Sequence, residues 1–200
     1  MTPMAALAVT GDVGAGKSAA ARLMEDMGAA RFDADVIAGE MWRRPDVLRA
    51  ALSRWGPGIL DPEGRVAHRA VAARIFTDRA EYQWCCALLH PLVMEDLERR
   101  VLALPRDRWA VAEIPLLFEA GRPWWVAAAV FVTAPRDVRL ARCRQRGWDE
   151  AELERREGFF LPSGERMARS DFVLRNDGNL EALKAGILRI VRSEQLRIRN

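Results

Sequence analysis

Cysteine and histidine are scarce in this chain of 200 residues. The three cysteines, Cys85, Cys86 and Cys143, form no C-x-x-C pair, and there are only two histidines. A disulfide framework normally uses an even number of cysteines, and zinc sites use closely spaced Cys and His ligands, so the sequence supports neither. We interpret the cysteines as small packing residues with inert thiols and expect a cytoplasmic protein.

Long apolar runs are also missing. No stretch approaches the length of a membrane span, and the N-terminus lacks the pattern of a secretory signal. The formal net charge is only +3, although the pI is about 9.1. This charge is too mild to favour nucleic acid as a partner. We expect no membrane or nucleic-acid partner, and a monomer or a weak homo-oligomer.

The sequence does contain a complete phosphate-binding motif near its start. G-x-x-x-x-G-K-[ST] is matched by Gly11-Asp12-Val13-Gly14-Ala15-Gly16-Lys17-Ser18. An apolar run precedes this P-loop and helix-forming residues at 18–27 follow it, so a strand, a glycine-rich turn and a helix N-terminus meet at one point. Lys17 is expected to reach the β- and γ-phosphates, and Ser18 to hold Mg²⁺. The motif therefore predicts a nucleoside triphosphate site.

Strand-like and helical segments alternate along the chain, which predicts an α/β fold with a five-stranded parallel sheet flanked by helices. The expected strands are residues 7–10, 30–33, 109–114, 128–133 and 172–174. A long helix is expected over 78–104, interrupted or bent at Pro91. A C-terminal helix is expected over 180–198, with apolar residues at 180, 183, 187, 190 and 191 facing the sheet.

Two segments are more than simple connections between strands. Residues 41–104 are mostly helical, and we expect them to form a substrate-binding subdomain. Residues 147–170 are charged and contain Pro162-Ser163-Gly164, which suits a short mobile lid. Both are expected to belong to a single domain over residues 1–200.

Acidic residues follow two of the expected strands, at the edge where ligands of open α/β sheets bind. Asp33 and Asp35 follow the second strand. One is a candidate to accept a proton from the attacking hydroxyl, and the other to orient the substrate or act through the water shell of the metal. The structural alternative is that one of them caps a helix starting near Val36. Glu113 ends the third strand and is either a second carboxylate near the metal or an exposed strand-end residue.

Arginines cluster between residues 136 and 146. Arg142 and Arg146 lie one helical turn apart on a face that leads to the expected lid, and they are candidates to neutralise the transferring phosphate. The other arginines of this cluster are expected to be solvated or salt-bridged.

Five landmarks, in order along nearly the whole chain, resemble those of the dephospho-coenzyme A kinase family. The first is the strand, P-loop and Asp33-Ala34-Asp35 block. The family's F-G-x-x-I-L…G, apolar-apolar-His-Pro, D-x-P-L-L-F-E and A-D-x-x-I-x-N-x-G segments are similar to residues 55–64, 88–91, 113–119 and 170–178. Four positions depart from the family pattern: Asp12 replaces a glycine, His68 an arginine with Arg69 adjacent, Glu113 an aspartate, and Phe160 a glutamine.

The resemblance implies the P-loop kinase fold and transfer of the γ-phosphate of ATP, with Mg²⁺, to the 3′-hydroxyl of the ribose of dephospho-coenzyme A. This is the last step of coenzyme A synthesis. It implies that Asp35 is the general base, that Asp33 is its companion, and that Asn176 and Gly178 lie near the adenine. The implied substrate-binding residues are Asp35, His68, Arg69, His90, Glu113 and Leu116. His90 has packing or capping of a helix as its structural alternative and is assigned no chemistry.

Three other functions remain as alternatives. A nucleoside or nucleotide kinase would share the P-loop and the lid. A GTP-dependent switch is suggested by D-x-x-G at residues 61–64, but this segment lies far from a strand end and the guanine-reading N-K-x-D is absent. The third is a relative that binds ATP and coenzyme A without turnover.

Overall fold

The computed structural model describes residues 6–105 and 107–193. These residues form two compact units. The first combines Met1–Asp33 with Glu98–Asn200, and the second consists of Ala34–Leu97. None of the helices in the described part of the chain is long and apolar enough to cross a membrane.

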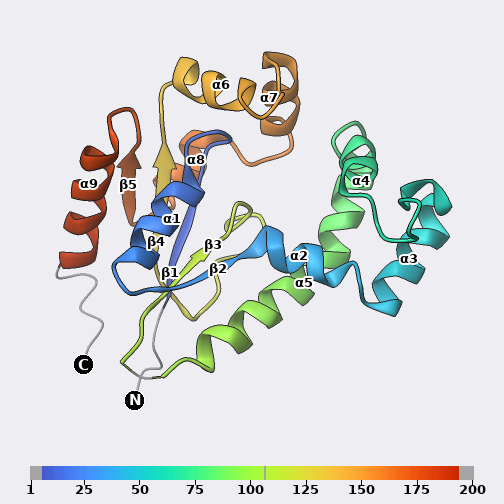
Figure 1. Cartoon of the computed structure of the whole chain (residues 1–200), viewed down its shortest axis with the longest axis horizontal. Coiled ribbons are helices and arrows are strands. Elements are labelled where there is room, and N and C mark those ends of the chain that lie inside the picture. The colour runs from blue at the N-terminus through green and yellow to red at the C-terminus, as the bar shows by residue number, and fades with distance from the viewer. Residues whose placement is uncertain (1–5, 106, 194–200) are drawn as a thin grey trace. The chain divides into compact units, whose positions relative to one another are not determined.

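The first unit contains a sheet of five parallel strands in the order β2-β3-β1-β4-β5 (Figure 1). The strands are β1 (Ala6–Gly11), β2 (Ala30–Asp33), β3 (Ala110–Glu113), β4 (Val126–Thr133) and β5 (Phe172–Arg175). Each expected strand is confirmed, with ends within two residues of the prediction. The signal was strong because a central strand of a parallel sheet is buried on both faces and is apolar almost throughout.

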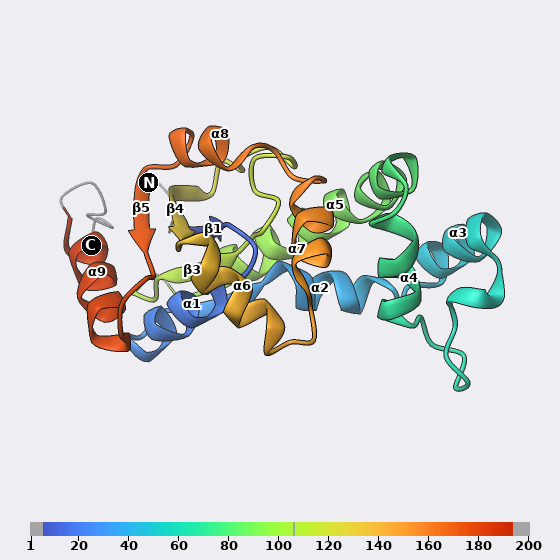
Figure 2. The same ribbon diagram turned by 90° about the horizontal axis from the view of Figure 1, so that it is seen from above.

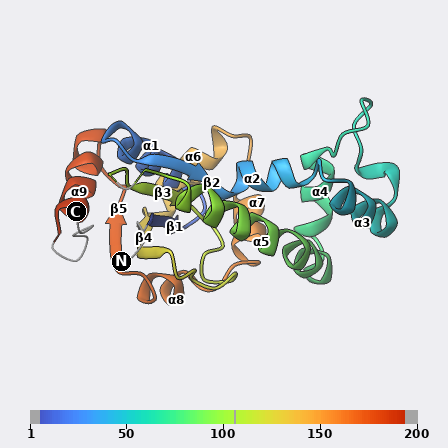
Figure 3. The same cartoon turned by 90° about the horizontal axis from the view of Figure 1, so that it is seen from below.

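Helices lie on both faces of this sheet. On one face α1 (Lys17–Asp26) and α9 (Leu180–Arg192) pack with apolar residues of β1, β3 and β4 in one core. The short helix α8 (Ser163–Ala168) lies on the opposite face from α1, as Figures 2 and 3 show. Side chains of β4 therefore alternate between the two layers, with Val130 and Val132 in the α1 core and Phe131 on the α8 side. Helices α6 (Arg136–Arg144) and α7 (Glu150–Glu157) connect β4 to α8.

The C-terminal helix differs from the expectation in one respect. Leu183, Ile187 and Ile190 are buried and Val191 packs against them, but Leu180 is 60% exposed. Leu180 is the first residue of α9, and the apolar stripe reaches the sheet only one turn later. Its assignment to the core was wrong. Residues 194–198 of the expected helix lie outside the described residues.

The second unit is helical. It contains α2 (Ala34–Met41), α3 (Pro45–Trp55), the 3-10 turn η1 (Pro57–Ile59), α4 (His68–Ile75) and most of α5 (Arg79–Leu102). Helix α2 begins at Ala34, directly after β2, rather than near Val36. Helix α5 runs through Pro91 without interruption, so the missing N–H of the proline removes one hydrogen bond but does not end the helix.

An aromatic cluster joins α3 to α5 in this unit. The ring of Trp55 lies 6.3 Å from that of Trp42 and 4.8 Å from that of Trp84. Glu81 accepts hydrogen bonds from Arg54, at 2.7 and 2.9 Å, and from the Trp55 indole at 2.5 Å. These bonds, led by the one from Arg54, lower the pKa of the Glu81 carboxyl. The cluster fixes the packing of α3 on α5 within the unit.

Two of the three cysteines behave as packing residues. Cys85 and Cys143 are buried, and burial raises the pKa of the Cys85 thiol to about 12. A thiol with this pKa is protonated near neutral pH and is a poor nucleophile. Cys85 therefore matches the expectation of an inert core residue, and Cys143 matches the expectation of a packing residue in being buried.

The D-x-x-G segment at residues 61–64 forms a turn of the second unit. The Asp61 carboxylate accepts from the backbone N–H of Glu63 at 3.1 Å and of Arg65 at 2.8 Å, and from the Arg65 side chain at 3.0 Å. Leu60 and Val66 pair on either side of it. The aspartate thus stabilises a turn, which is its complete structural explanation.

Candidate active site

The P-loop connects β1 to α1 and requires glycine at both ends. A Cβ at Gly11 would lie 2.0 Å from the Val132 carbonyl oxygen, so a side chain there would collide with β4. Gly16 has a φ of 96°, and a Cβ there would lie 2.2 Å from the Asn176 amide nitrogen. Only glycine allows this approach of the loop to β4 and to the residue after β5.

Side chains from outside the loop hold its carbonyl groups. Arg139 donates to the Val13 carbonyl at 3.2 Å. Arg142 and Asn176 donate to the Ala15 carbonyl, at 3.1 and 2.8 Å. In a trans peptide the N–H points away from the C=O, so the Gly14 and Gly16 N–H groups point away from these donors. Backbone N–H groups turned away from such donors in a glycine-rich loop suit an anion.

Lys17 lies against the first turn of the loop. Its Nζ donates to the Gly11 carbonyl at 3.3 Å and to the Asp12 carbonyl at 3.0 Å. The ammonium group is therefore folded back onto the loop that would hold a phosphate, within reach of any anion bound there.

Ser18 and Glu113 form a polar pair beside the loop. The Ser18 hydroxyl donates to Glu113 Oε1 at 2.8 Å, and Glu113 is buried. Glu113 also pairs in register with Val9 of β1 and Asp33 of β2, so it lies at the carboxyl edge of the sheet between these strands. The alternative of an exposed strand-end glutamate is wrong, because Ser18 and the neighbouring strands enclose this side chain.

The oxygen atoms at this edge fit a magnesium ion. A hydroxyl (Ser18) and two carboxylates (Glu113 and Asp33) are the hard donors that Mg²⁺ prefers, and Mg²⁺ keeps several waters. Among the described residues there is no cluster of three His, Cys, Asp or Glu side chains that could hold a metal. The residues present therefore suit an ion held partly by water and by the nucleotide, rather than by a full protein cage.

Asp12 does not face the loop interior. Its side chain is buried, pairs with Arg166 at 3.2 Å and accepts from the Thr133 hydroxyl at 2.7 Å. The extra anion of this P-loop is thus neutralised by a buried cation.

The arginines of α6 fall into two groups. Arg136 lies at the surface and pairs with Glu150 and Glu154, as expected for a solvated, salt-bridged side chain. Arg139 pairs with Glu157 but also binds the loop at Val13, so the expectation was incomplete for this residue. Arg142 donates to the Asn176 carbonyl at 3.0 Å as well as to Ala15. Arg146, just after α6, is exposed.

Two loop-binding arginines were missed by the sequence reasoning, Arg139 and Arg166. Arg139 lies three residues before Arg142, a spacing that places both on one face of α6 and was available as a signal. Arg166 stands in the charged segment that was expected to be a lid, and its sequence neighbours give no sign that it is buried.

The predicted residues are divided between the units. The P-loop, Asp33, Glu113, Leu116, Arg142, Arg146, Asn176 and Gly178 belong to the first unit, and Asp35, His68, Arg69 and His90 to the second. Asp35 is exposed in the first turn of α2. His68 begins α4, and a Cβ at Gly39 would lie 3.5 Å from its ring. His90 is half-buried within α5, one residue before Pro91.

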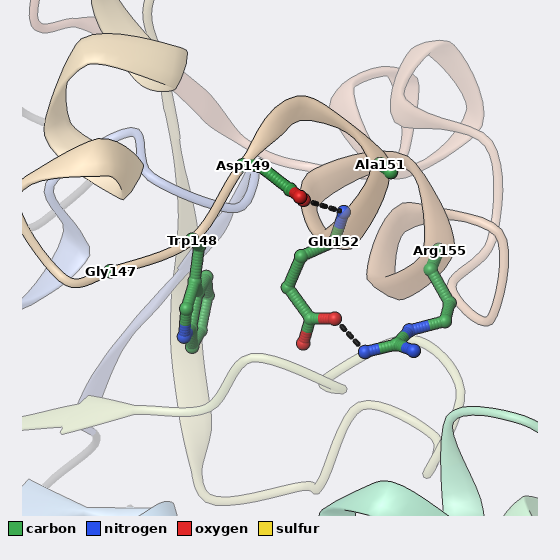
Figure 4. Close-up of a pocket in the computed structure, with 6 residues that line it drawn as sticks. All are labelled: Gly147, Trp148, Asp149, Ala151, Glu152 and Arg155. Atoms are coloured by element: carbon green, nitrogen blue, oxygen red, sulfur yellow. Dashed lines mark hydrogen bonds and ion pairs between the residues drawn. The ribbon is translucent and has the colours of Figure 1, made fainter.

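The segment expected to be a lid has its own hollow, of about 410 Å³, beside α7. Figure 4 shows the Glu152 carboxylate directed toward Arg155, with the Trp148 indole on the other side of Glu152. Glu152 also accepts from Arg156 at 2.6 Å, and the Arg156 guanidinium lies 4.0 Å from the centre of the Trp148 ring. One carboxylate thus holds two arginines of this segment.

A family model and curated relatives agree on one family, and solved structures share the fold. A family model described as dephospho-CoA kinase matches residues 5–182. The dephospho-CoA kinase of Deinococcus radiodurans is 38% identical over 182 residues, which cover 89% of this chain and 86% of that protein. A crystal structure of a Thermus thermophilus protein has a TM-score of 0.77 and 30% identity, covering 95% of this chain and 97% of its own. The dephospho-CoA kinase of Campylobacter jejuni shares the fold with a TM-score of 0.66 and 18% identity, covering 94% and 95%.

Proposed function

The chain belongs to the dephospho-CoA kinase family, and from this premise we propose that it transfers the γ-phosphate of ATP to the 3′-hydroxyl of the ribose of dephospho-coenzyme A. The products are coenzyme A and ADP. The observation that carries the proposal is the hydrogen bond between Ser18 and Glu113. It joins the P-loop, which any such kinase needs, to the segment 113–119 that resembles this family in particular.

ATP is held by the P-loop, and side chains from outside the loop hold the loop in shape. The loop N–H groups and Lys17 bind the phosphates and stabilise the charge that develops on the transferring group. Arg142 and Asn176 keep the loop in this shape through Ala15. The adenine lies near Asn176 and Gly178, and Arg142 and Arg146 supply positive charge on the lid side.

Ser18 holds Mg²⁺, with Glu113 or Asp33 acting through its water shell. When bound, the ion would supply positive charge that neutralises the phosphate oxygens of ATP. Glu113 accepts a hydrogen bond from the Ser18 hydroxyl, which turns the hydroxyl lone pairs away from this carboxylate.

The Glu113→Gln variant is expected to lower kcat about tenfold to a hundredfold and to raise the Mg²⁺ concentration that gives half the maximal rate. The side chain keeps its size but loses the charge that supports the ion. Steady-state rates across a magnesium titration measure both effects. Glu181→Gln, an exposed change in the first turn of α9, is the control. An unchanged magnesium dependence in Glu113→Gln would remove this residue from the metal site.

Asp35 is the general base that takes the proton of the 3′-hydroxyl, and Asp33 is its companion. Residues 41–104 form the subdomain that binds dephospho-coenzyme A, with His68, Arg69 and His90 among its substrate contacts and Glu113 and Leu116 contributing from the end of β3. Residues 147–170 form a lid that closes over ATP and excludes water from the phosphoryl group.

We also place the protein in the cytoplasm, as a monomer or a weak homo-oligomer. Cys85, Cys86 and Cys143 form no disulfide in the structure, which suits a reducing compartment.

ADP release in a coupled assay tests the function directly. We expect kcat/KM for dephospho-coenzyme A to exceed that for every nucleoside and nucleotide in a panel by at least roughly a thousandfold, because binding energy from the remote part of the substrate is used at the reacting centre. Comparable rates with a nucleoside or nucleotide would identify the alternative kinase. ATP binding with no ADP release from any acceptor would identify a relative without turnover.

A further inference from the structure

Arg166 is a buried arginine on the sheet face opposite α1. It is only 2% exposed and comes from α8. Its three guanidinium nitrogens each donate one hydrogen bond, from Nε to the Leu161 carbonyl at 2.9 Å, from Nη1 to the Gly11 carbonyl at 3.0 Å and from Nη2 to Asp12 at 3.2 Å. A charge taken out of water needs such partners to remain stable. The arginine thus links residues 161–166 to the first turn of the P-loop.

Two departures from the family pattern meet at this arginine. Asp12 supplies the counter-ion, and its second oxygen accepts from Thr133 at 2.7 Å. Phe160 supplies a ring 5.5 Å from the guanidinium carbon, and Phe131 of β4 a second ring at 5.4 Å. An aspartate in place of glycine and a phenylalanine in place of glutamine therefore belong to one arrangement around Arg166. Both replacements are therefore explained by contact with the same buried arginine, and neither has to be a separate defect of the nucleotide site.

Arg166 and Lys17 share the Gly11 carbonyl. Lys17 lies 3.3 Å from this oxygen and 3.0 Å from the Asp12 carbonyl. To bind both the β- and γ-phosphates with its three N–H donors, the ammonium group must give up at least one of these two oxygens. The Gly11 carbonyl then still accepts a hydrogen bond from Arg166, and the Asp12 carbonyl still accepts one from the Ala15 N–H at 3.2 Å. The loop turn can therefore release Lys17 without leaving a carbonyl unsatisfied.

We propose that Arg166 is a positioning residue of the nucleotide site, which holds the first turn of the P-loop through Gly11 and Asp12 while Lys17 moves to the phosphates. The proposal rests on the P-loop being the ATP site. It predicts that Arg166 governs nucleotide affinity without touching the nucleotide, and that Arg166 and Asp12 act as one unit.

The test compares Arg166→Met with the wild type. Methionine keeps the aliphatic stem of the side chain but leaves Asp12 buried without its cation. We expect the Kd of ADP, measured by calorimetry without acceptor, to rise at least about tenfold, and the KM of ATP to rise in parallel. The KM of dephospho-coenzyme A should stay within about twofold. Arg166→Lys keeps the charge but has fewer directed donors, so its Kd for ADP should lie between those of the wild type and Arg166→Met.

A double-mutant cycle makes the inference independent of folding losses. Asp12→Gly restores the glycine of the family pattern, and Asp12→Gly combined with Arg166→Met removes both buried charges. We expect the double variant to bind ADP at least about fivefold more tightly than Arg166→Met alone. If Arg166→Met does not fold, the double variant and Thr133→Val, which removes one bond to Asp12, carry the test with the same ADP titration.

Three results would overturn the proposal: an unchanged Kd of ADP in folded Arg166→Met, equal rises in the KM of both substrates, or strictly independent effects in the cycle. Each leaves the wild-type binding of ADP in place. Failure of the wild type itself to bind ADP would instead remove the nucleotide site on which the proposal rests, so the two failures are distinguishable. Thermal unfolding, recorded in parallel, separates lost stability from lost affinity.

Discussion

Replacement of Lys17 by alanine is expected to lower kcat at least about a hundredfold while the fold survives. In the proposed mechanism the ammonium group moves onto the transferring phosphoryl group, and removing one donor that stabilises transition-state charge costs about a hundredfold to a thousandfold. The fold survives because both oxygens that Lys17 contacts retain another donor, Gly11 from Arg166 and Asp12 from the Ala15 N–H. Single-turnover rates with saturating ATP report the chemical step.

The chain offers an unusually clean control for this prediction. It contains only two lysines, Lys17 and Lys184, and Lys184 is exposed on α9. Lys184→Ala should leave the rate within about twofold of wild type. A lysine-selective acetylating reagent read by mass spectrometry gives a second measurement, in which ATP should protect Lys17 and leave Lys184 reactive. Equal labelling of Lys17 with and without ATP would contradict its place on the phosphates.

The sheet and the loop were predictable because their signals are local. A short apolar run bounded by turn residues favours a buried strand, and the glycine-rich motif itself predicts the positive φ values of Gly11, Gly14 and Gly16. The C-terminal helix shows the limit of such a signal. Periodicity placed Leu180 with Leu183 and Ile187 on one face, but it does not tell where along that face the sheet begins to cover the helix.

The side chains that hold the P-loop were not predictable as its partners, because they are far from the loop in the chain. Asp12 and Arg166 are separated by 154 residues and Arg139 by 126 from Val13. From the sequence, an aspartate among glycines suggests an anion near the phosphates, and an arginine in a charged segment suggests solvent exposure. Each is buried only because the other is there. No local sequence pattern around either residue predicts a partner of opposite charge so far away in the chain.

Glu113 was predictable in part: its position could be inferred from the sequence, but its burial could not. Its position at a strand end was evident, and parallel strands bring their carboxyl ends to one edge. The sequence left open whether the side chain is exposed or buried, because burial depends on β1 and β2 flanking β3 and on Ser18 lying 2.8 Å away. The order of the strands in the sheet decides this, and that order cannot be inferred from the local sequence.

Replacement of Asp35 by asparagine is expected to lower kcat by about a hundredfold to ten-thousandfold, the range for loss of a general base. Asparagine keeps the size and hydrogen-bonding reach of the side chain but takes no proton from the 3′-hydroxyl. The KM of dephospho-coenzyme A should change far less than kcat, because the ground-state contact is preserved. The measurement is a steady-state rate at saturating ATP and acceptor, together with its pH profile.

The control for Asp35 must remove the effect of a carboxylate at a helix N-terminus, which stabilises a helix by about 0.3–1 kcal/mol. Asp35 and Asp137 are both exposed acids in the first turn of a helix, α2 and α6. Asp137→Asn should therefore reproduce the small loss of helix stability without the loss of rate. Asp33→Asn completes the comparison: a near-normal rate in Asp35→Asn with a collapsed rate in Asp33→Asn would transfer the base to Asp33.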